Sequence, residues 1–202
     1  MIRSKNAVGI INIAGGNITS LYNAIDKKYS SVFEVTNIKK RIKFDTLIFP
    51  GVGNISNLSK QLLDQDSIIY EHIHLERIII GICMGLQILS EFSTETEPKS
   101  YGLSLLQGHA SNLKSVKSHI GWNTVNFSED SIFSDYDKTD FYFNHKFRMH
   151  EISSDFITGT SHINEFETIP SVIEKNNIIG FQFHPEKSQD KGKELLNHSL
   201  IA

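Results

Sequence analysis

The chain has 202 residues, which fits one domain, and 39% of them are hydrophobic, enough to form a core. With 20 Lys and Arg against 23 Asp and Glu, the net charge is −3. This balance leaves no basic excess for a dedicated nucleic-acid binder. The single cysteine excludes an internal disulfide framework and any multi-cysteine metal site.

The apolar stretch 7–14 follows Arg3 and Lys5, an order that a weak secretory signal would also show. A buried strand that runs into the turn at Gly15 and Gly16 explains the same residues better. No apolar run approaches the roughly 20 residues that cross a bilayer. We therefore expect a cytoplasmic protein with no membrane contact.

Strand and helix patterns alternate in the first half of the chain. We predict strands over 8–13, 32–35, 45–49 and 77–80. We predict helices over 18–25 and 86–92, after the first and the last of these strands, because apolar residues recur there at helical spacing. A third, more polar helix is predicted over 56–63. Such alternation requires crossover connections, so it is typical of a largely parallel sheet covered on both faces.

The second half carries short strand-like segments instead. They lie at 119–123, 141–145, 156–160, 172–174 and 178–183. This pattern favours a meander of antiparallel or mixed strands, followed by a helix over 192–199. Because no repeat or linker interrupts the chain, we predict one α/β domain over residues 1–202.

The strongest local signal for chemistry surrounds Cys83. An apolar strand ends there, Gly81 and Gly85 stand two residues to either side, and a predicted helix follows. This order is typical of a nucleophile elbow, whose flanking glycines allow a tight, strained turn. A cysteine at a helix start favours the thiolate. The alternative is that Cys83 is a small buried hydrophobic side chain, as most free cysteines are.

A cysteine nucleophile requires an oriented base. His184 follows the apolar strand 178–183 and precedes Pro185 and Glu186. Because parallel strands end at one edge of a sheet, we expect His184 and Cys83 to meet there, with Glu186 accepting the imidazole N–H. The alternative is an ordinary histidine in a proline turn.

The remaining histidines are interpreted as solvated or as satisfied structural residues. His72 and His74 have no other ligand set nearby, so we expect them at the surface and predict no metal site.

The segment 50–53 also ends a predicted strand. Gly51 and Gly53 allow a peptide N–H, such as that of Val52, to turn toward a substrate carbonyl. With the amide N–H of Met84 it would form an oxyanion hole, the usual partner of an acyl-transfer nucleophile. A β-turn without function is the alternative.

Two segments, 81–87 (GICMGLQ) and 180–188 (GFQFHPEKS), resemble the signatures of class I, triad-type glutamine amidotransferases. Within that family, the segments 50–53, 119–123 and 142–145 resemble the glutaminase subunits of imidazole glycerol phosphate synthases. The resemblance spans residues 8 to about 198.

The resemblance implies a flavodoxin-like α/β fold: a mostly parallel central sheet with helices on both faces and an additional antiparallel portion in the second half. It implies hydrolysis of L-glutamine to glutamate and ammonia by Cys83 as nucleophile, His184 as acid–base group and Glu186 as its orienting partner. Gln87 would contact the α-amino or carboxylate end of glutamine. No cofactor and no metal are implied.

The resemblance also implies a partner. Ammonia would pass, shielded from water, to a separate (β/α)8 cyclase subunit that forms imidazole glycerol phosphate in histidine biosynthesis. That subunit is expected to dock over the carboxyl ends of the strands, with Asn17, Trp122 and Tyr142 at or near the contact. For Trp122, an ordinary core position is the alternative.

The chain departs from the family pattern at 144–147, where valine, histidine, serine and tyrosine are usual and this chain reads NHKF. Lys146 therefore takes the place of a serine near the substrate glutamine. One alternative is a paralogue that supplies ammonia for an amidino sugar in surface polysaccharide synthesis. A second alternative is an inactive scaffold, which the presence of all three triad residues argues against. A third is a stand-alone cysteine hydrolase or peptidase, which the His-Pro-Glu turn argues against.

Overall fold

The computed structural model describes residues 5–13, 18–39, 42–51 and 67–201. Their strands form two sheets. The larger has nine strands in the order β2-β1-β3-β4-β13-β12-β11-β8-β9, and the smaller has four in the order β10-β7-β5-β6.

Half of the large sheet is parallel, as the alternating pattern predicted. Its strands are β1 (Asn6–Ile11), β2 (Ser30–Val35), β3 (Thr46–Phe49), β4 (Ile78–Ile82) and β13 (Ile178–Phe181). They coincide with the predicted apolar runs to within a few residues. These runs are apolar throughout because both faces of a parallel sheet are buried.

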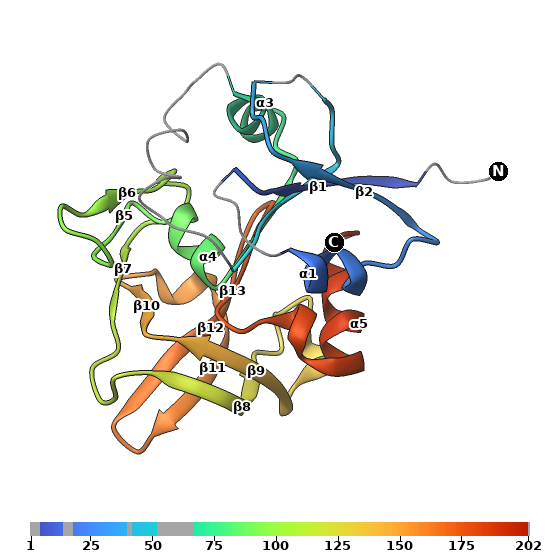
Figure 1. Cartoon of the computed structure of the whole chain (residues 1–202). Helices are drawn as coiled ribbons and strands as arrows, with labels where there is room; N and C mark the ends of the chain where they lie inside the picture. The colour runs from blue at the N-terminus through green and yellow to red at the C-terminus, as the bar shows by residue number, and fades with distance from the viewer. Residues whose placement is uncertain (1–4, 14–17, 40–41, 52–66, 202) are drawn as a thin grey trace.

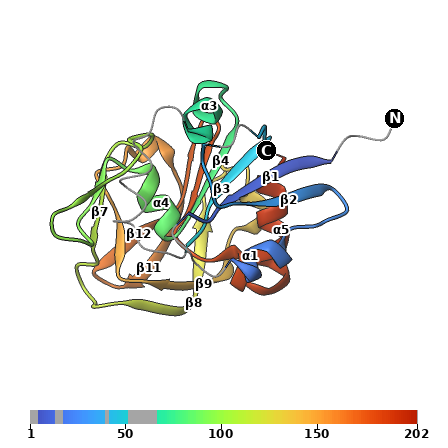
Figure 2. The same cartoon turned by 45° about the horizontal axis from the view of Figure 1, so that its top comes forward.

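Helices cover both faces of this parallel half (Figures 1 and 2). Helices α1 (Thr19–Ala24) and α5 (Gln189–Ser199) pack on one face, and α3 (Ile68–His74) and α4 (Met84–Leu89) on the other. Successive side chains of a strand point to opposite faces of the sheet. Ile48 and Ile80 therefore pack in the hydrophobic core beneath α1 and α5, whereas Leu47 and Ile79 pack in the core beneath α3 and α4. The predicted fold class is confirmed.

The antiparallel half continues the same sheet. It consists of β12 (Glu167–Lys175), β11 (Ile157–Asn164), β8 (His119–Phe127) and β9 (Thr139–His145). Aromatic packing joins it to the parallel half, where the rings of Phe141 and Phe183 stack with centroids 4.3 Å apart. The predicted meander is present.

The small sheet was not predicted. It consists of β5 (Phe92–Ser93), β6 (Ser100–Tyr101), β7 (His109–Asn112) and β10 (Phe147–His150). Strands of two to four residues are too short to show a period. The prediction that Phe92 extends the helix behind Cys83 is wrong, because α4 ends at Leu89 and Phe92 begins β5.

Three short 3-10 turns complete the described elements: η1 (Ser134–Tyr136), η2 (Ser154–Phe156) and η3 (Pro185–Lys187). The predicted helix 192–199 is the body of α5, whereas the predicted helix 56–63 lies outside the described residues.

One surface prediction is wrong. His74 is exposed as expected, but His72 is only 3% exposed, because it lies on the inner face of α3. Its Nε2 is 2.8 Å from the carbonyl oxygen of Ile78, so the ring links the end of α3 to the start of β4.

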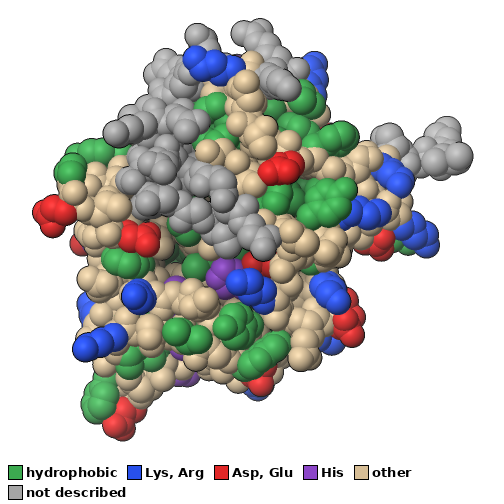
Figure 3. All heavy atoms as spheres, in the orientation of Figure 1, with side chains coloured by type: hydrophobic (Ala, Val, Ile, Leu, Met, Phe, Trp, Pro, Cys, Tyr) green, Lys and Arg blue, Asp and Glu red, His purple; other side chains and the backbone are tan. Residues whose placement is uncertain are grey.

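Acidic and basic side chains are interspersed over the face in Figure 3. Among the helices that the structure describes, none is long and apolar enough to cross a membrane.

Candidate active site

Three neighbouring parallel strands end at one edge of the sheet. Phe49 at the end of β3 pairs with Gly81 on β4, and Phe181 at the end of β13 pairs with Ile82. The chain therefore places Gly51, Cys83 and His184 side by side just beyond these ends. The structure brings Cys83 and His184 together as expected: a Cβ added to Gly51 would lie 3.1 Å from Cβ of Cys83 and 2.6 Å from Cε1 of His184.

Cys83 has a strained backbone, with φ 48° and ψ −104°. Its N–H donates to the carbonyl of Phe181 at 2.7 Å, which fixes the turn against β13. The side chain is buried and begins α4. Positive φ, burial and a helix start are the features expected of a nucleophile elbow.

The flanking glycines serve a different purpose from the one predicted. Among the described glycines only Gly108 and Gly121 have φ in the left-handed range, so the strain rests on Cys83 itself. A Cβ on Gly85 would lie 1.9 Å from the carbonyl oxygen of Phe49. Glycine is therefore required there because α4 packs directly on the end of β3.

The imidazole of His184 is held between two groups. Its Nδ1 lies 2.8 Å from Oε1 of Glu186 on η3, which leaves Nε2 for the neighbouring Cys83. Both side chains are buried, with 3% and 6% exposed. The hydroxyl of Ser188 donates to the carbonyl of His184 at 2.6 Å and accepts the N–H of Tyr142 at 2.9 Å. Ser188 thereby fixes the turn to β9.

The electrostatics of this group favour a charged imidazole. Burial alone would lower the pKa of His184, but the hydrogen bonds and charges of Cys83 and Glu186 outweigh it and raise this pKa to about 10.

Gly51 lies against both catalytic candidates. A Cβ at this position would stand 2.6 Å from Cε1 of His184 and 3.1 Å from Cβ of Cys83. Only glycine fits between the strand end and the imidazole. Val52 and Gly53, the other predicted oxyanion residues of this segment, lie outside the described residues.

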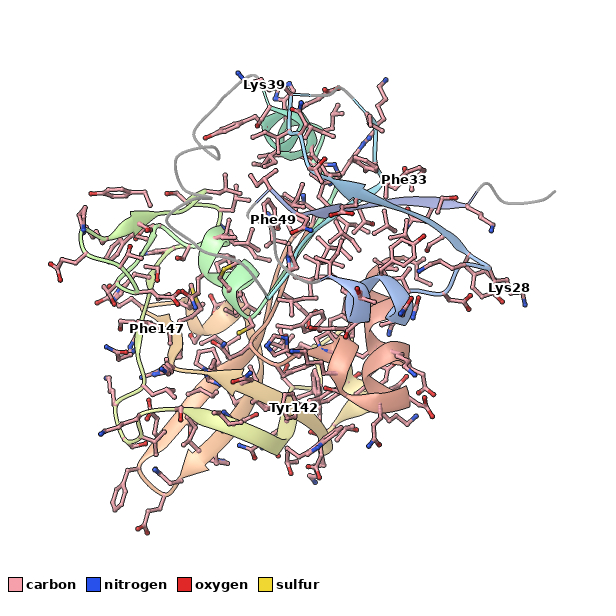
Figure 4. All side chains as sticks on the ribbon, in the orientation of Figure 1. Lys28, Phe33, Lys39, Phe49, Tyr142 and Phe147 are labelled. Carbon is pink, nitrogen blue, oxygen red and sulfur yellow. The ribbon has the colours of Figure 1, made fainter. Side chains whose placement is uncertain are left out.

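A pocket of about 300 Å³ opens beside Cys83. Met84 and Gln87 of α4 line one side, and the turn between β9 and β10 lines the other through Asn144, His145, Lys146 and Phe147. In Figure 4, Tyr142 of β9 and Phe147 of β10 lie below Phe49, which ends β3. The carbonyl of Asn144 is 3.8 Å from the Cys83 sulfur.

Gln87 is held in place within this pocket. It is buried, and its Oε1 accepts the hydroxyl of Ser93 at 2.9 Å. The amide NH2 is thus the end of Gln87 available to a ligand carbonyl or carboxylate. Glu95 also lines the pocket. It was not predicted as a site residue, because nothing in the polar loop after Phe92 indicates that this loop lies beside Cys83.

A pair of histidines supports the other side of the pocket. His145 Nε2 lies 2.9 Å from Nδ1 of His119, its cross-strand partner, and His145 Nδ1 lies 2.9 Å from the carbonyl oxygen of Phe147. Burial and the neighbouring His119 lower the pKa of His145 to about 3. Burial also lowers the pKa of His119. Because a carbonyl oxygen can only accept, His145 Nδ1–H donates to Phe147, and the free Nε2 of His145 accepts Nδ1–H of His119.

A larger pocket of about 650 Å³ lies elsewhere, between the small sheet and β11 and β12. His109, Lys114 and Arg148 line it, and it holds neither Cys83 nor His184. Within the described part of the chain no cluster of His, Cys, Asp and Glu could hold a metal ion.

Trp122 is 49% exposed, so the alternative that it is a core residue is wrong. Its ring meets the Tyr142 ring edge-on across β8 and β9, with centroids 6.1 Å apart. Both aromatic side chains of the predicted contact thus share one strand pair, whereas Asn17 lies outside the described residues.

The family model of the class-I glutamine amidotransferases matches residues 17–202. The chain belongs to this family. Among curated proteins, the amidotransferase is 36% identical to the imidazole glycerol phosphate synthase subunit HisH of Thermotoga maritima over 197 residues, which is 94% of each chain. It is also 36% identical to the subunit of the same name from Aquifex aeolicus, over 94% of this chain and 93% of that one.

Solved structures share the fold of this amidotransferase. The structure of PurLQS from Thermotoga maritima has a TM-score of 0.71 at 18% identity, over 98% of this chain and 99% of that one. A further crystal structure of a glutamine amidotransferase gives a TM-score of 0.69 at 16% identity, over 96% of this chain and 97% of that one.

Proposed function

We propose that this chain is the glutaminase subunit of an imidazole glycerol phosphate synthase: it hydrolyses L-glutamine and passes ammonia to a (β/α)8 cyclase subunit. The observation that carries the proposal is the buried alignment of Cys83, His184 and Glu186 at the carboxyl ends of adjacent strands, beside a pocket. The HisH name of the similar proteins supports the choice of synthase.

In the first step, the Cys83 sulfur attacks the side-chain amide carbon of glutamine, and the S–C bond forms as the C=O becomes an oxyanion. His184 holds the thiol proton as imidazolium, which its raised pKa favours. It then delivers that proton to the amide nitrogen. The C–N bond breaks, ammonia leaves, and a γ-glutamyl thioester remains.

In the second step, water attacks the thioester carbon. His184, now neutral, accepts a proton from the water, and the S–C bond breaks to release glutamate and the Cys83 thiolate. Glu186 keeps Nδ1 protonated throughout, so Nε2 is the only ring atom that exchanges protons with the substrate.

The oxyanion would be held by backbone donors. Met84 follows the nucleophile at the first position of α4, where N–H groups have no intrahelical partner. We propose Met84 N–H as one donor and the segment 50–53 as the source of the other, with the Val52 N–H as the candidate.

Two side chains would receive the amino-acid end of glutamine. Glu95, a carboxylate in the pocket, suits the α-ammonium group, and the NH2 of Gln87 suits a substrate oxygen. The pocket thus offers a thiol for the side-chain amide and polar groups for the α-carbon end.

The partner would cover this edge, because ammonia released into bulk water is protonated and loses its nucleophilicity. We propose Trp122 and Tyr142 as contact residues, since the exposed ring of Trp122 packs against the half-buried ring of Tyr142 and aromatic side chains suit an interface core. Asn17 is proposed on the resemblance alone. The (β/α)8 type of the partner, the cytoplasmic location and a single domain over 1–202 are parts of the same proposal.

Supply of ammonia for an amidino sugar is not favoured, because the similar curated proteins are named as subunits of imidazole glycerol phosphate synthase. An inactive scaffold would not need a buried, aligned Cys–His–Glu group.

Affinity labelling tests the proposal. A glutamine analogue with a chloromethyl ketone in place of the side-chain amide should alkylate Cys83 once, and excess L-glutamine should protect the thiol. Labelling that glutamine does not slow would contradict a glutamine pocket at Cys83.

A further inference from the structure

The pocket beside Cys83 contains one cationic side chain. Lys146 lies in the turn between β9 and β10 and lines the pocket, as does the carboxylate of Glu95. His145, the neighbouring basic residue, is neutral because its pKa is lowered to about 3. Lys146 is therefore the only positive charge among the described residues that line this pocket.

The backbone of Lys146 is anchored, and its side chain is exposed. Its carbonyl accepts the N–H of Leu113 at 2.9 Å, and His145 next to it is fixed by His119 and Phe147.

Burial raises the pKa of Glu95 in the same pocket, and the charge of Lys146 opposes that shift, so the two groups act on each other. Among the described residues, no carboxylate forms an ion pair with the ammonium group. The pocket beside Cys83 is thus lined by a cation and a carboxylate, Lys146 and Glu95, which do not form an ion pair with each other.

Glutamine bound with its amide at Cys83 carries an α-carboxylate that needs a compensating charge away from water. We propose that Lys146 binds this α-carboxylate and so selects the free amino acid over substrates in which the carboxyl group is blocked. This assignment rests on the proposed glutaminase function. Charge-assisted hydrogen bonds from an ammonium group are the interaction expected there.

The test compares two substrates and three variants in the complex with the cyclase subunit. Ammonia release is measured with L-glutamine and with L-glutamine α-methyl ester, which lacks the negative charge. Lys146→Met removes the cation, Lys146→Arg keeps it, and Lys117→Met removes an exposed lysine that does not line this pocket.

Lys146→Met should raise KM for glutamine about 10- to 100-fold and leave kcat within about twofold, because the lost contact is equal in ground and transition states. KM for the ester should stay unchanged. Lys146→Arg should restore most of the glutamine KM, and Lys117→Met should match wild type.

Three results would overturn the assignment: an unchanged KM in Lys146→Met, equal losses for both substrates, or an equal loss in Lys117→Met. A wild-type complex that released no ammonia from glutamine would refute the glutaminase function itself. Failure of the Lys146 assignment alone would leave wild-type hydrolysis intact.

Discussion

The Nδ1 atom of His184 lies 2.8 Å from Oε1 of Glu186, and this contact leaves Nε2 as the ring nitrogen available to Cys83. The geometry arises from strand order. Because β4 and β13 are parallel neighbours, the residues beyond their ends meet without a long connecting loop. Three adjacent strand ends thus supply the proposed nucleophile, its proposed base and the glycine that leaves room for both.

Glu186→Gln should retain the fold and lose the charge that supports the imidazolium. We expect kcat/KM to fall about 10²- to 10⁴-fold. The pKa of His184 should also fall, so the alkaline limb of kcat/KM should move to lower pH by at least about one unit. Steady-state rates of the complex from pH 6 to 10 measure both effects. An unmoved alkaline limb would show that Glu186 does not act through His184.

Gly51→Ala should place a methyl group 2.6 Å from Cε1 of His184. Displacement of the imidazole should lower kcat/KM about 100-fold, because small misplacements of catalytic groups have effects of that size. Thermal unfolding should change little, since the close contacts are with the side chains of His184 and Cys83 and not with the backbone. Wild-type activity in this variant would mean that the segment after β3 lies farther from His184 than described.

The pH dependence of stability should have two opposite slopes. The depressed pKa of His145 means that the unfolded chain binds more protons between about pH 3 and 6.5, so stability rises with pH there. The raised pKa of His184 reverses the sign: its contribution is complete below about pH 6.5 and is lost as pH rises toward 10. Denaturant unfolding across this range measures both slopes.

His145→Asn should flatten the acid slope by up to about 1.4 kcal/mol per pH unit and leave the alkaline slope in place. His74→Asn, at an exposed position, is the matched control and should change neither slope. Equal slopes in wild type and His145→Asn would contradict a buried neutral imidazole at this position.

The parallel half and the elbow could be predicted because their signals are local. Each buried strand is a continuous apolar run that ends at glycine or proline, and Cys83 stands at the end of one such run. The order of these elements then placed His184 on the same edge.

The histidine pair could not be predicted, because it arises from cross-strand register. His119 and His145 are far apart in sequence and meet only through the pairing of β8 with β9. The place of Glu95 likewise depends on the two-residue strand β5. The burial of His72 depends on which face of α3 packs against the sheet. The sequence of this short helix does not indicate that face.

Trp122→Ala should weaken the complex with the cyclase subunit or uncouple glutamate release from product formation. The ring is half exposed and contacts Tyr142, so its loss should leave the isolated chain folded. Titration of the wild-type chain with the partner should shift the emission of this single tryptophan. An unchanged spectrum together with full coupling in the variant would place the contact elsewhere.

The most direct test replaces Cys83, the proposed nucleophile. The complex that carries Cys83→Ala is assayed for the cyclase product, once with glutamine and once with ammonium salts. We predict no glutamate release and no product from glutamine, and wild-type product formation from ammonium, because only the generation of ammonia requires the thiol. Glutamate release at a rate comparable to wild type would contradict Cys83 as the nucleophile.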